Sequence, residues 1–230
     1  MAFINEFDLR NTYSDSNNTL TKLLTVTNDL SIRVNKAVAR IKSYIQHRYD
    51  PEQVFIDVLE FSTATEYTTG QLIQYTESDY VAATTYDINA RVVYEDKIYK
   101  SLQGSNTGNQ PDTADTFWEF VVNDNQYYVA AQDSTGNYPE DDTYWTTGDT
   151  RDPSIVDICC WLTLYDLYSG GNPRTNPEIV QIRYENAIDD LKAYQRGDRT
   201  VILPVQVDED GDEEGHEINY GSETKRTIDF

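Results

Sequence analysis

Three Asx-Pro dipeptides mark helix starts in this chain, at Asp50-Pro51, Asp152-Pro153 and Asn176-Pro177. A short Asp or Asn side chain can accept a hydrogen bond from a free N–H of the first helical turn. Proline fits the position that follows, because the N–H that it lacks is not needed there. All three dipeptides lie outside a central region of different character, so the sequence predicts helices on both sides of that region.

The central region, residues 66–151, is rich in Tyr, Thr, Asn, Asp and Gly. We therefore predict an α+β chain in which a helical domain of about four helices is interrupted by a β-rich insertion. Residues 1–65 form the N-terminal part of the helical domain, and residues 152–198 form its C-terminal part. Residues 199–230 combine a short apolar run with an acidic tail, which predicts an extended C-terminal arm.

Apolar residues at helical spacing support both helical parts. In the first part, Asn28 or Asp29 is expected to cap a helix, and its core face follows the i, i+4, i+7, i+11 pattern at Val34, Val38, Ile41 and Ile45. The helix that starts at Pro51 is expected to direct four residues to the core: Val54, Val58, Leu59 and Phe61.

Two more helices are predicted in the second part. One ends at Gly170-Gly171 and the other at Gly197, because glycine tolerates the left-handed conformation that follows a helix. The core face of the first helix comprises Ile155, Ile158 or Cys159, Leu162, Tyr165 and Tyr168. The core face of the second comprises Val180, Tyr184, Ala187, Leu191 and Tyr194.

The insertion contains a degenerate repeat, with copies at residues 98–120 and 127–148. Each copy carries a Gly-x-x-Pro sequence and then an aromatic-Trp pair. Residues 90–94 and 97–100 predict two strands joined by the turn Glu95-Asp96. Copies this short need support, and there is no disulfide framework to supply it, so they are expected to pack on each other or on the helical domain.

Five aromatic residues of the repeat are candidates for an exposed surface that contacts a protein partner or a glycan: Tyr99, Trp118, Tyr127, Tyr128 and Trp145. Aromatic rings can stack on sugars or on a protein partner. They can equally form the core of a small β module that has few aliphatic residues. For both tryptophans the core role is favoured.

The chain carries 40 acidic and 18 basic residues, a formal net charge of −22. This charge disfavours binding to nucleic acid, which needs Lys and Arg to neutralise phosphates, and it disfavours docking on anionic membranes. No apolar run is longer than five residues, so no segment is expected to span a bilayer. The N-terminal sequence does not resemble a signal peptide, and the two cysteines are adjacent, so folding in a reducing cytoplasm is expected.

We predict no catalytic site, no cofactor and no metal. The alternating acids from Asp208 to Glu214 resemble a calcium loop, but Glu213 occupies the position that needs glycine and Asn219 the position that needs a bidentate Glu. Cys159 and Cys160 point to different sides of a helix, without nearby zinc ligands. The two histidines, His47 and His216, lie in no recognisable nucleophile motif. An enzyme is therefore not expected.

The helical parts resemble the head–tail connector (adaptor) proteins of tailed bacteriophages. The N-terminal likeness lies in SIRVNKAVARIKSYIQHRYD, residues 31–50, followed by a proline. The C-terminal likeness lies in residues 155–171 and 177–204, above all at Arg183-Tyr184, Ala187-Ile188, Leu191-Lys192 and Gly197. The resemblance implies a ring, twelvefold in that family, beneath the portal protein around the DNA exit channel.

The insertion resembles the small chitin/cellulose-binding-type β modules of secreted hydrolases and phage structural proteins. Val93-Tyr94, Tyr99, Gly108, Pro111 and Trp118 fit their pattern in the first copy, and Tyr127 or Tyr128, Gly136, Pro139 and Trp145 fit in the second. The usual leading Trp is missing near residues 80–86. A protein-contact role is therefore at least as plausible as sugar binding.

From these resemblances we expect a virion structural protein, assembled in the host cytoplasm and located at the head–tail interface. Its expected partners are copies of itself, the portal, a downstream tail or fibre protein, and passing DNA without specific binding. Seven arm residues are candidates for portal contact: Val201, Ile202, Leu203, Pro204, Val205, Tyr220 and Phe230. The alternatives are a carbohydrate- or cell-surface-binding module on a helical stalk, and an acidic decoy that binds a basic host protein.

Overall fold

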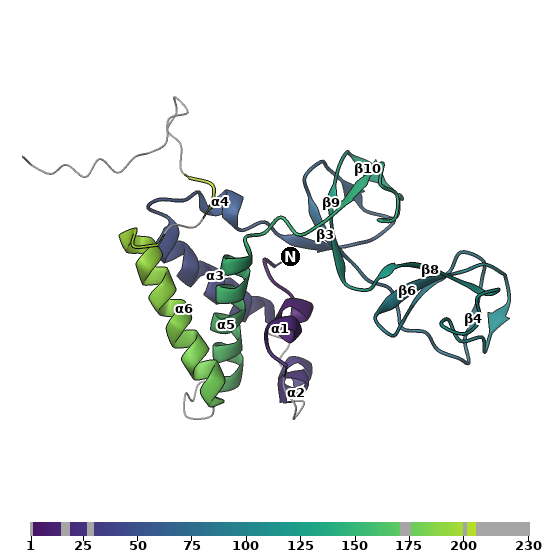
Figure 1. Cartoon of the computed structure of the whole chain (residues 1–230), viewed down its shortest axis with the longest axis horizontal. Coiled ribbons are helices and arrows are strands. Elements are labelled where there is room, and N and C mark those ends of the chain that lie inside the picture. The colour runs from purple at the N-terminus through teal and green to yellow at the C-terminus, as the bar shows by residue number, and fades with distance from the viewer. Residues whose placement is uncertain (1, 15–18, 27–29, 171–175, 200–201, 206–230) are drawn as a thin grey trace, which may run out of the picture.

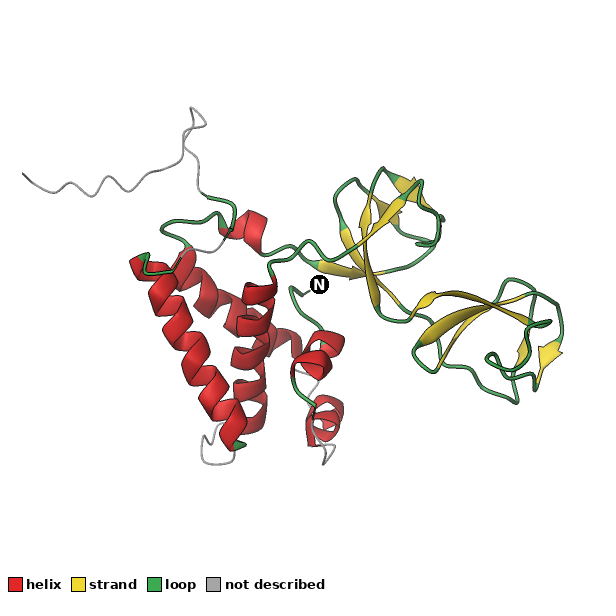
Figure 2. Cartoon of the chain, viewed as in Figure 1, coloured by secondary structure: helices red, strands yellow, loops and turns green. Residues whose placement is uncertain are grey.

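The computed structural model describes residues 2–14, 19–26, 30–170, 176–199 and 202–205. Over these residues the chain is mixed α+β, with six helices and several small sheets (Figures 1 and 2). The helices are α1 (Glu6–Thr12), α2 (Thr19–Val26), α3 (Leu30–Ile45), α4 (Pro51–Val54), α5 (Pro153–Ser169) and α6 (Glu178–Arg196). The strands are β1 (Val58–Glu60), β2 (Glu66–Tyr67), β3 (Leu72–Tyr75), β4 (Thr85–Tyr86), β5 (Arg91–Tyr94), β6 (Lys97–Ser101), β7 (Asn106–Thr107), β8 (Trp118–Asn123), β9 (Gln126–Ala130), β10 (Ser134–Thr135) and β11 (Trp145–Thr147).

Helices from the two ends of the chain share one apolar core. Val34 and Ile41 of α3 lie in the same buried cluster as Ile155 of α5 and Leu191 of α6. α5 is central: Ile158, Cys159, Cys160, Trp161 and Leu162 are all buried, so it is covered on every side. Helical spacing leaves Ile158 and Cys159 as alternatives for the core face, and both are buried.

The predicted helix ends agree with the structure at most positions. Asp152 caps α5 by accepting hydrogen bonds from the N–H groups of Ser154 and Ile155, and Asp50 caps α4 in the same way. Gly170 and Gly197 end α5 and α6 with φ of 46° and 77°. The expected capping by Asn176 is wrong, because Pro177 occupies the N-cap of α6 and no side chain caps that helix.

The helix predicted after Pro51 is much shorter than expected. α4 is a single turn of four residues, and Val58–Glu60 forms strand β1. Leu59 and Phe61 therefore pack against the β region instead of the helical core, while Val54 is in the helical core as predicted. α1 was not predicted at all. The predicted capping residues Asn28 and Asp29 lie outside the described residues.

The β region consists of two copies of one module. The inner module, residues 58–77 and 124–148, contains the sheet β1-β3-β9-β11 and the pair β2-β10. The outer module, residues 78–123, contains the sheet β5-β6-β8 and the pair β4-β7. In the outer module Asp79 bridges Val93 in parallel, as β1 pairs with β3 in the inner one. The outer module lies farther from the helices (Figure 1).

The outer module is inserted into the hairpin of the inner module. In the outer module, β5 and β6 end at the pair Tyr94–Lys97 and are joined by the two-residue turn Glu95-Asp96, as predicted, with φ of 49° and 58°. In the inner module, β3 and β9 end at the corresponding pair, Tyr75–Gln126. The whole outer module connects them. The repeat is therefore longer than the sequence analysis proposed, and the two copies are nested instead of consecutive.

The two modules repeat the same hydrogen bonds. The backbone N–H of Ser62 donates to the Tyr67 hydroxyl at 2.7 Å, and the N–H of Val81 donates to the Tyr86 hydroxyl at 2.7 Å. The indole N–H of Trp145 donates to the carbonyl of Asn137 at 3.0 Å, and Trp118 does the same to Asn109 at 2.8 Å. These paired contacts show that residues 61–75 correspond to residues 80–94.

The modules also pack on each other, which was one of the two packing arrangements predicted. Val93 and Ile98 of the outer module lie in the apolar cluster of the inner module. Arg91 of the outer module forms an ion pair with Glu140, and its guanidinium lies 3.3 Å from the ring centre of Tyr138. Both partners belong to the inner module, so charge and apolar burial hold the two copies together.

We predict that the inner module folds without the outer one. Residues 76–124 would be replaced by one asparagine, which with Asn125 (φ 57°) forms a two-residue turn. Loss of the contacts of Val93 and Ile98 should lower the free energy of unfolding by roughly 2–4 kcal/mol, with the helical core intact. Urea unfolding followed by Trp fluorescence measures this, and a chain with a flexible Gly/Ser linker in place of the turn is the control. An inner module that unfolds in both variants would contradict the nested arrangement.

Candidate functional site

The five predicted surface aromatics do not form a surface. Trp118, Trp145, Tyr99 and Tyr128 are buried, with Trp145 only 1% exposed. Tyr127 is half-buried at the junction with the helices. Burial raises the pKa of Tyr128 to about 12, so its hydroxyl stays protonated at neutral pH. The four buried residues belong to the module cores, so a glycan or a tail protein would have to contact others.

Two aromatic side chains are more accessible in the outer module than at the same positions in the inner one. Tyr86 and Tyr94 are half-buried, whereas their counterparts Tyr67 and Tyr75 are fully buried. Tyr80 and its counterpart Phe61 are both half-buried. Tyr80 and Tyr86 stack with ring centres 5.8 Å apart, and both make T-shaped contacts with the buried Trp118. This outer aromatic cluster (Tyr80, Tyr86 and Tyr94) was missed by the sequence analysis. The 19-residue offset between Tyr67 and Tyr86, and between Tyr75 and Tyr94, is the signal that could have revealed it.

A buried ion pair joins the helices to the inner module. The Arg151 side chain is fully buried and donates to both carboxylate oxygens of Asp8 in α1, at 2.9 and 3.0 Å. It also donates to Asp149 at 2.7 Å and to the carbonyl of Phe3. Burial lowers the pKa of Arg151, but the hydrogen bonds to Asp149 and Asp8 outweigh burial and raise it above its ordinary value. Arg151 is therefore a permanent cation at the junction.

Asp8 is the shared acceptor of this junction. Its carboxylate accepts from the N–H of Asn5, which completes the capping box of α1, and from the Tyr127 hydroxyl at 2.7 Å. Burial and the charge of Asp8 raise the pKa of Tyr127, so that hydroxyl remains a donor. The Asn5 amide continues the network to Gln74 at 2.8 Å. α1 is thereby fixed to strands β3 and β9.

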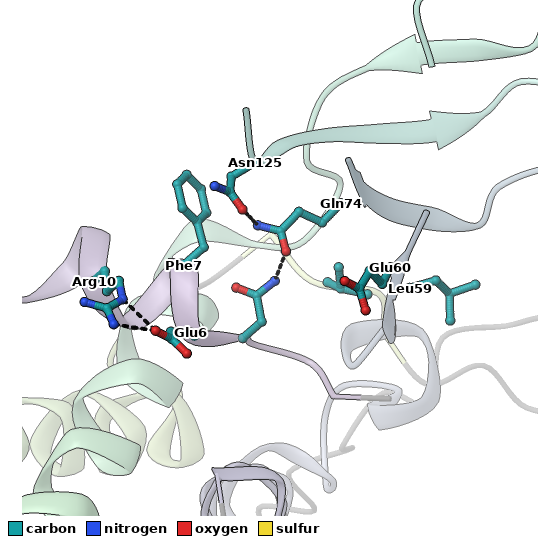
Figure 3. Close-up of a pocket in the computed structure, with 9 residues that line it drawn as sticks. Glu6, Phe7, Arg10, Leu59, Glu60, Gln74 and Asn125 are labelled. Carbon is teal, nitrogen blue, oxygen red and sulfur yellow. Dashed lines mark hydrogen bonds and ion pairs between the residues drawn. The ribbon is translucent and has the colours of Figure 1, made fainter. Parts of the chain in front are cut away.

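A cavity of about 400 Å³ lies beside this junction, between α1 and the edge of the inner module (Figure 3). Glu6, Phe7 and Arg10 line it from α1, and Leu59, Glu60, Gln74 and Asn125 line it from the β side. Glu6 pairs with Arg10, and the Gln74 amide donates to Asn125 at 3.0 Å. Much of its polar lining is therefore already paired. Among the described residues, no group of three or more His, Cys, Asp and Glu could share a metal ion.

One face of α3 is basic in an otherwise acidic chain. Arg33, Lys36 and Arg40 form this face, called here the α3 basic stripe, and line a groove against α5 and α6. Arg33 donates to the Asp166 carboxylate at 2.9 Å, and the Lys36 amine lies 3.9 Å from the same group. Arg40 donates to the neutral Tyr184 hydroxyl at 2.8 Å. The sequence between residues 30 and 49 contains no acidic residue.

The start of the predicted arm lies against the chain's own helices. Leu203 is buried in the helical core, Val205 bridges Tyr49, and the N–H of Asp50 donates to the carbonyl of Pro204 at 2.8 Å. Ile202 is fully exposed. Of the other residues proposed for portal contact, Val201, Tyr220 and Phe230 lie outside the described residues, as does the calcium-like acidic run.

Comparisons with models of protein families, with curated proteins and with solved structures found no match to this chain. Within the described part of the chain, no helix is both long enough and apolar enough to cross a membrane. Both cysteines are buried, and burial raises the pKa of each thiol, which disfavours the thiolate form.

We predict that Arg151→Met destabilises the fold by about 3–5 kcal/mol, because it leaves two carboxylates without their buried cation. Arg10→Met removes an exposed pair with Glu6 and should change the free energy of unfolding by less than about 1 kcal/mol. Urea unfolding measures both. In the double variant Asp8→Asn/Arg151→Met, the two losses should be less than additive. An Arg151→Met protein as stable as the Arg10→Met protein would contradict the role given to this pair.

Proposed function

We propose that this chain is a virion structural protein, a head–tail connector (adaptor) that forms a ring beneath the portal and links capsid to tail. The observation that carries the proposal is the core shared by helices from both ends of the chain, with the β modules leaving that body as an arm (Figure 1). In this proposal α1–α3, α5 and α6 are the helical adaptor domain and the β modules are its insertion. The sequence likeness at residues 31–50 and 155–204 supports the same assignment.

The proposed mechanism is assembly, not catalysis. Heterologous contacts close into a ring when the rotation between subunits permits, and each weak contact then acts many times. By resemblance the ring is twelvefold and provides part of the DNA channel. A subunit charge of −22 would let DNA pass without adhering, because carboxylates repel phosphates. The two β modules would project toward a downstream tail or fibre protein. Assembly would take place in the host cytoplasm.

The arm from residue 206 onward is the proposed portal contact. Deleting residues 206–230 leaves Leu203 and Val205 on the helical body, so the deletion should abolish portal binding without unfolding the protein. Electron microscopy of the protein mixed with the neighbouring gene products shows whether rings form on the portal. Replacing the outer module by a short turn is the matched control, which should still bind. Portal binding that survives the tail deletion would remove this contact from the proposal.

A second candidate function is binding of carbohydrate or a cell surface, and the outer aromatic cluster favours it. The rings of Tyr80 and Tyr86 stack on each other and are half-buried, and tyrosine rings are side chains of the kind that pack on sugars. If this is the function, Tyr80→Ala/Tyr86→Ala should lose retention on a chitin or cellulose column. Tyr86→Phe should keep it, because the ring remains. Phe120→Ala, an exposed aromatic in the same module outside the cluster, is the matched control. A wild-type protein that passes both columns unretained would exclude these two ligands.

A further inference from the structure

The α3 basic stripe carries more positive charge than its partners neutralise. Arg33 and Lys36 share the single carboxylate of Asp166, and Arg40 has a neutral hydroxyl as its partner. Lys36 and Arg40 are exposed. In a chain with a net charge of −22, such a stripe attracts anions that are held close to it.

The chain itself holds an acidic segment at one end of α3. Val205 bridges Tyr49, which follows the C-terminus of α3, so the last described residue before the acidic segment lies at this end of the helix. Arg33 lies 12 residues before Ile45, the last residue of α3, which is about 18 Å along the helix. Ten residues of extended chain span roughly 33 Å, so a segment that begins a few residues after Val205 can reach the whole stripe. Residues 208–217 contain seven acids: Asp208, Glu209, Asp210, Asp212, Glu213, Glu214 and Glu217.

We propose that residues 208–217 dock on the α3 basic stripe of the same chain. The short connection to Val205 gives the segment an effective concentration on the order of millimolar at the stripe, which a separate partner would have to exceed. Nucleic acid is disfavoured as the occupant, because the surrounding negative charge repels phosphates. Docking screens the stripe, and a partner that captures the tail would expose it. The contact is internal and does not depend on the connector function.

Carbodiimide cross-linking tests the contact, because it joins an amine to a carboxylate without a linker and so requires the two groups to come into direct contact. In the full chain, trypsin should yield Lys36 (residues 34–40) joined to the tail peptide (residues 200–225). The yield should fall about fivefold between roughly 20 mM and 500 mM salt. Lys192, which pairs with Asp189 on α6, should not join the tail and is the internal control. Absence of the Lys36 product at low salt would overturn the proposal.

Variants and isotope mixing distinguish docking within one chain from docking between two copies of the chain. Arg40→Gln should reduce the Lys36 product severalfold, whereas the matched change Arg196→Gln on α6 should not. In an equal mixture of ¹⁴N and ¹⁵N chains, docking within one chain gives cross-linked peptides of one isotope only. Mixed-isotope products would assign the stripe to a second copy and refute docking within the chain. An Arg40→Gln yield equal to wild type would refute the stripe as the docking site.

Discussion

The ion pair between Arg151 and Asp8 fixes how the two halves of this protein meet. A buried guanidinium is costly unless each of its donors finds an acceptor, and here Asp8, Asp149 and the carbonyl of Phe3 supply them. Arg151 lies where the chain returns from the β modules to α5, and Asp8 lies in the first helix. The pair therefore joins the beginning of the chain to the end of the insertion, and the capping box of α1 depends on the same carboxylate.

The nested arrangement explains why both modules are stable without a disulfide. Each copy is small, and its aromatic residues pack around one tryptophan whose indole N–H is satisfied by a backbone carbonyl. Insertion of one copy into the hairpin of the other places Val93 and Ile98 against the inner core, so burial across the two copies adds to burial within each. At the same interface burial raises the pKa of Glu77, whose carboxylate accepts from the Tyr75 hydroxyl, so this contact carries an electrostatic cost.

The sequence predicted features that depend on local chemistry. Helix starts at Asp50 and Asp152, the turn at Glu95-Asp96 and the apolar face of α3 follow from capping, turn geometry and periodicity. The helix predicted through Val58–Phe61 failed, because apolar residues there pack against a sheet that is assembled from distant strands. The nesting of the modules was missed for a related reason. The two halves of the inner module are separated by the entire outer module, so a search for consecutive copies found only their C-terminal halves.

The two modules also show how similar cores can carry different surfaces. Contacts that hold Trp118 and Trp145 are the same in both, because each ring needs one acceptor and aromatic neighbours. The position of Tyr138 in the inner module is occupied by Gln110 in the outer one. Arg91 of the outer module packs over the ring of Tyr138 and covers it. The outer module has no third copy beyond it to supply such a cover. Tyr86 and Tyr94 therefore remain partly exposed, and the outer module is the part of the β region best placed to meet a partner.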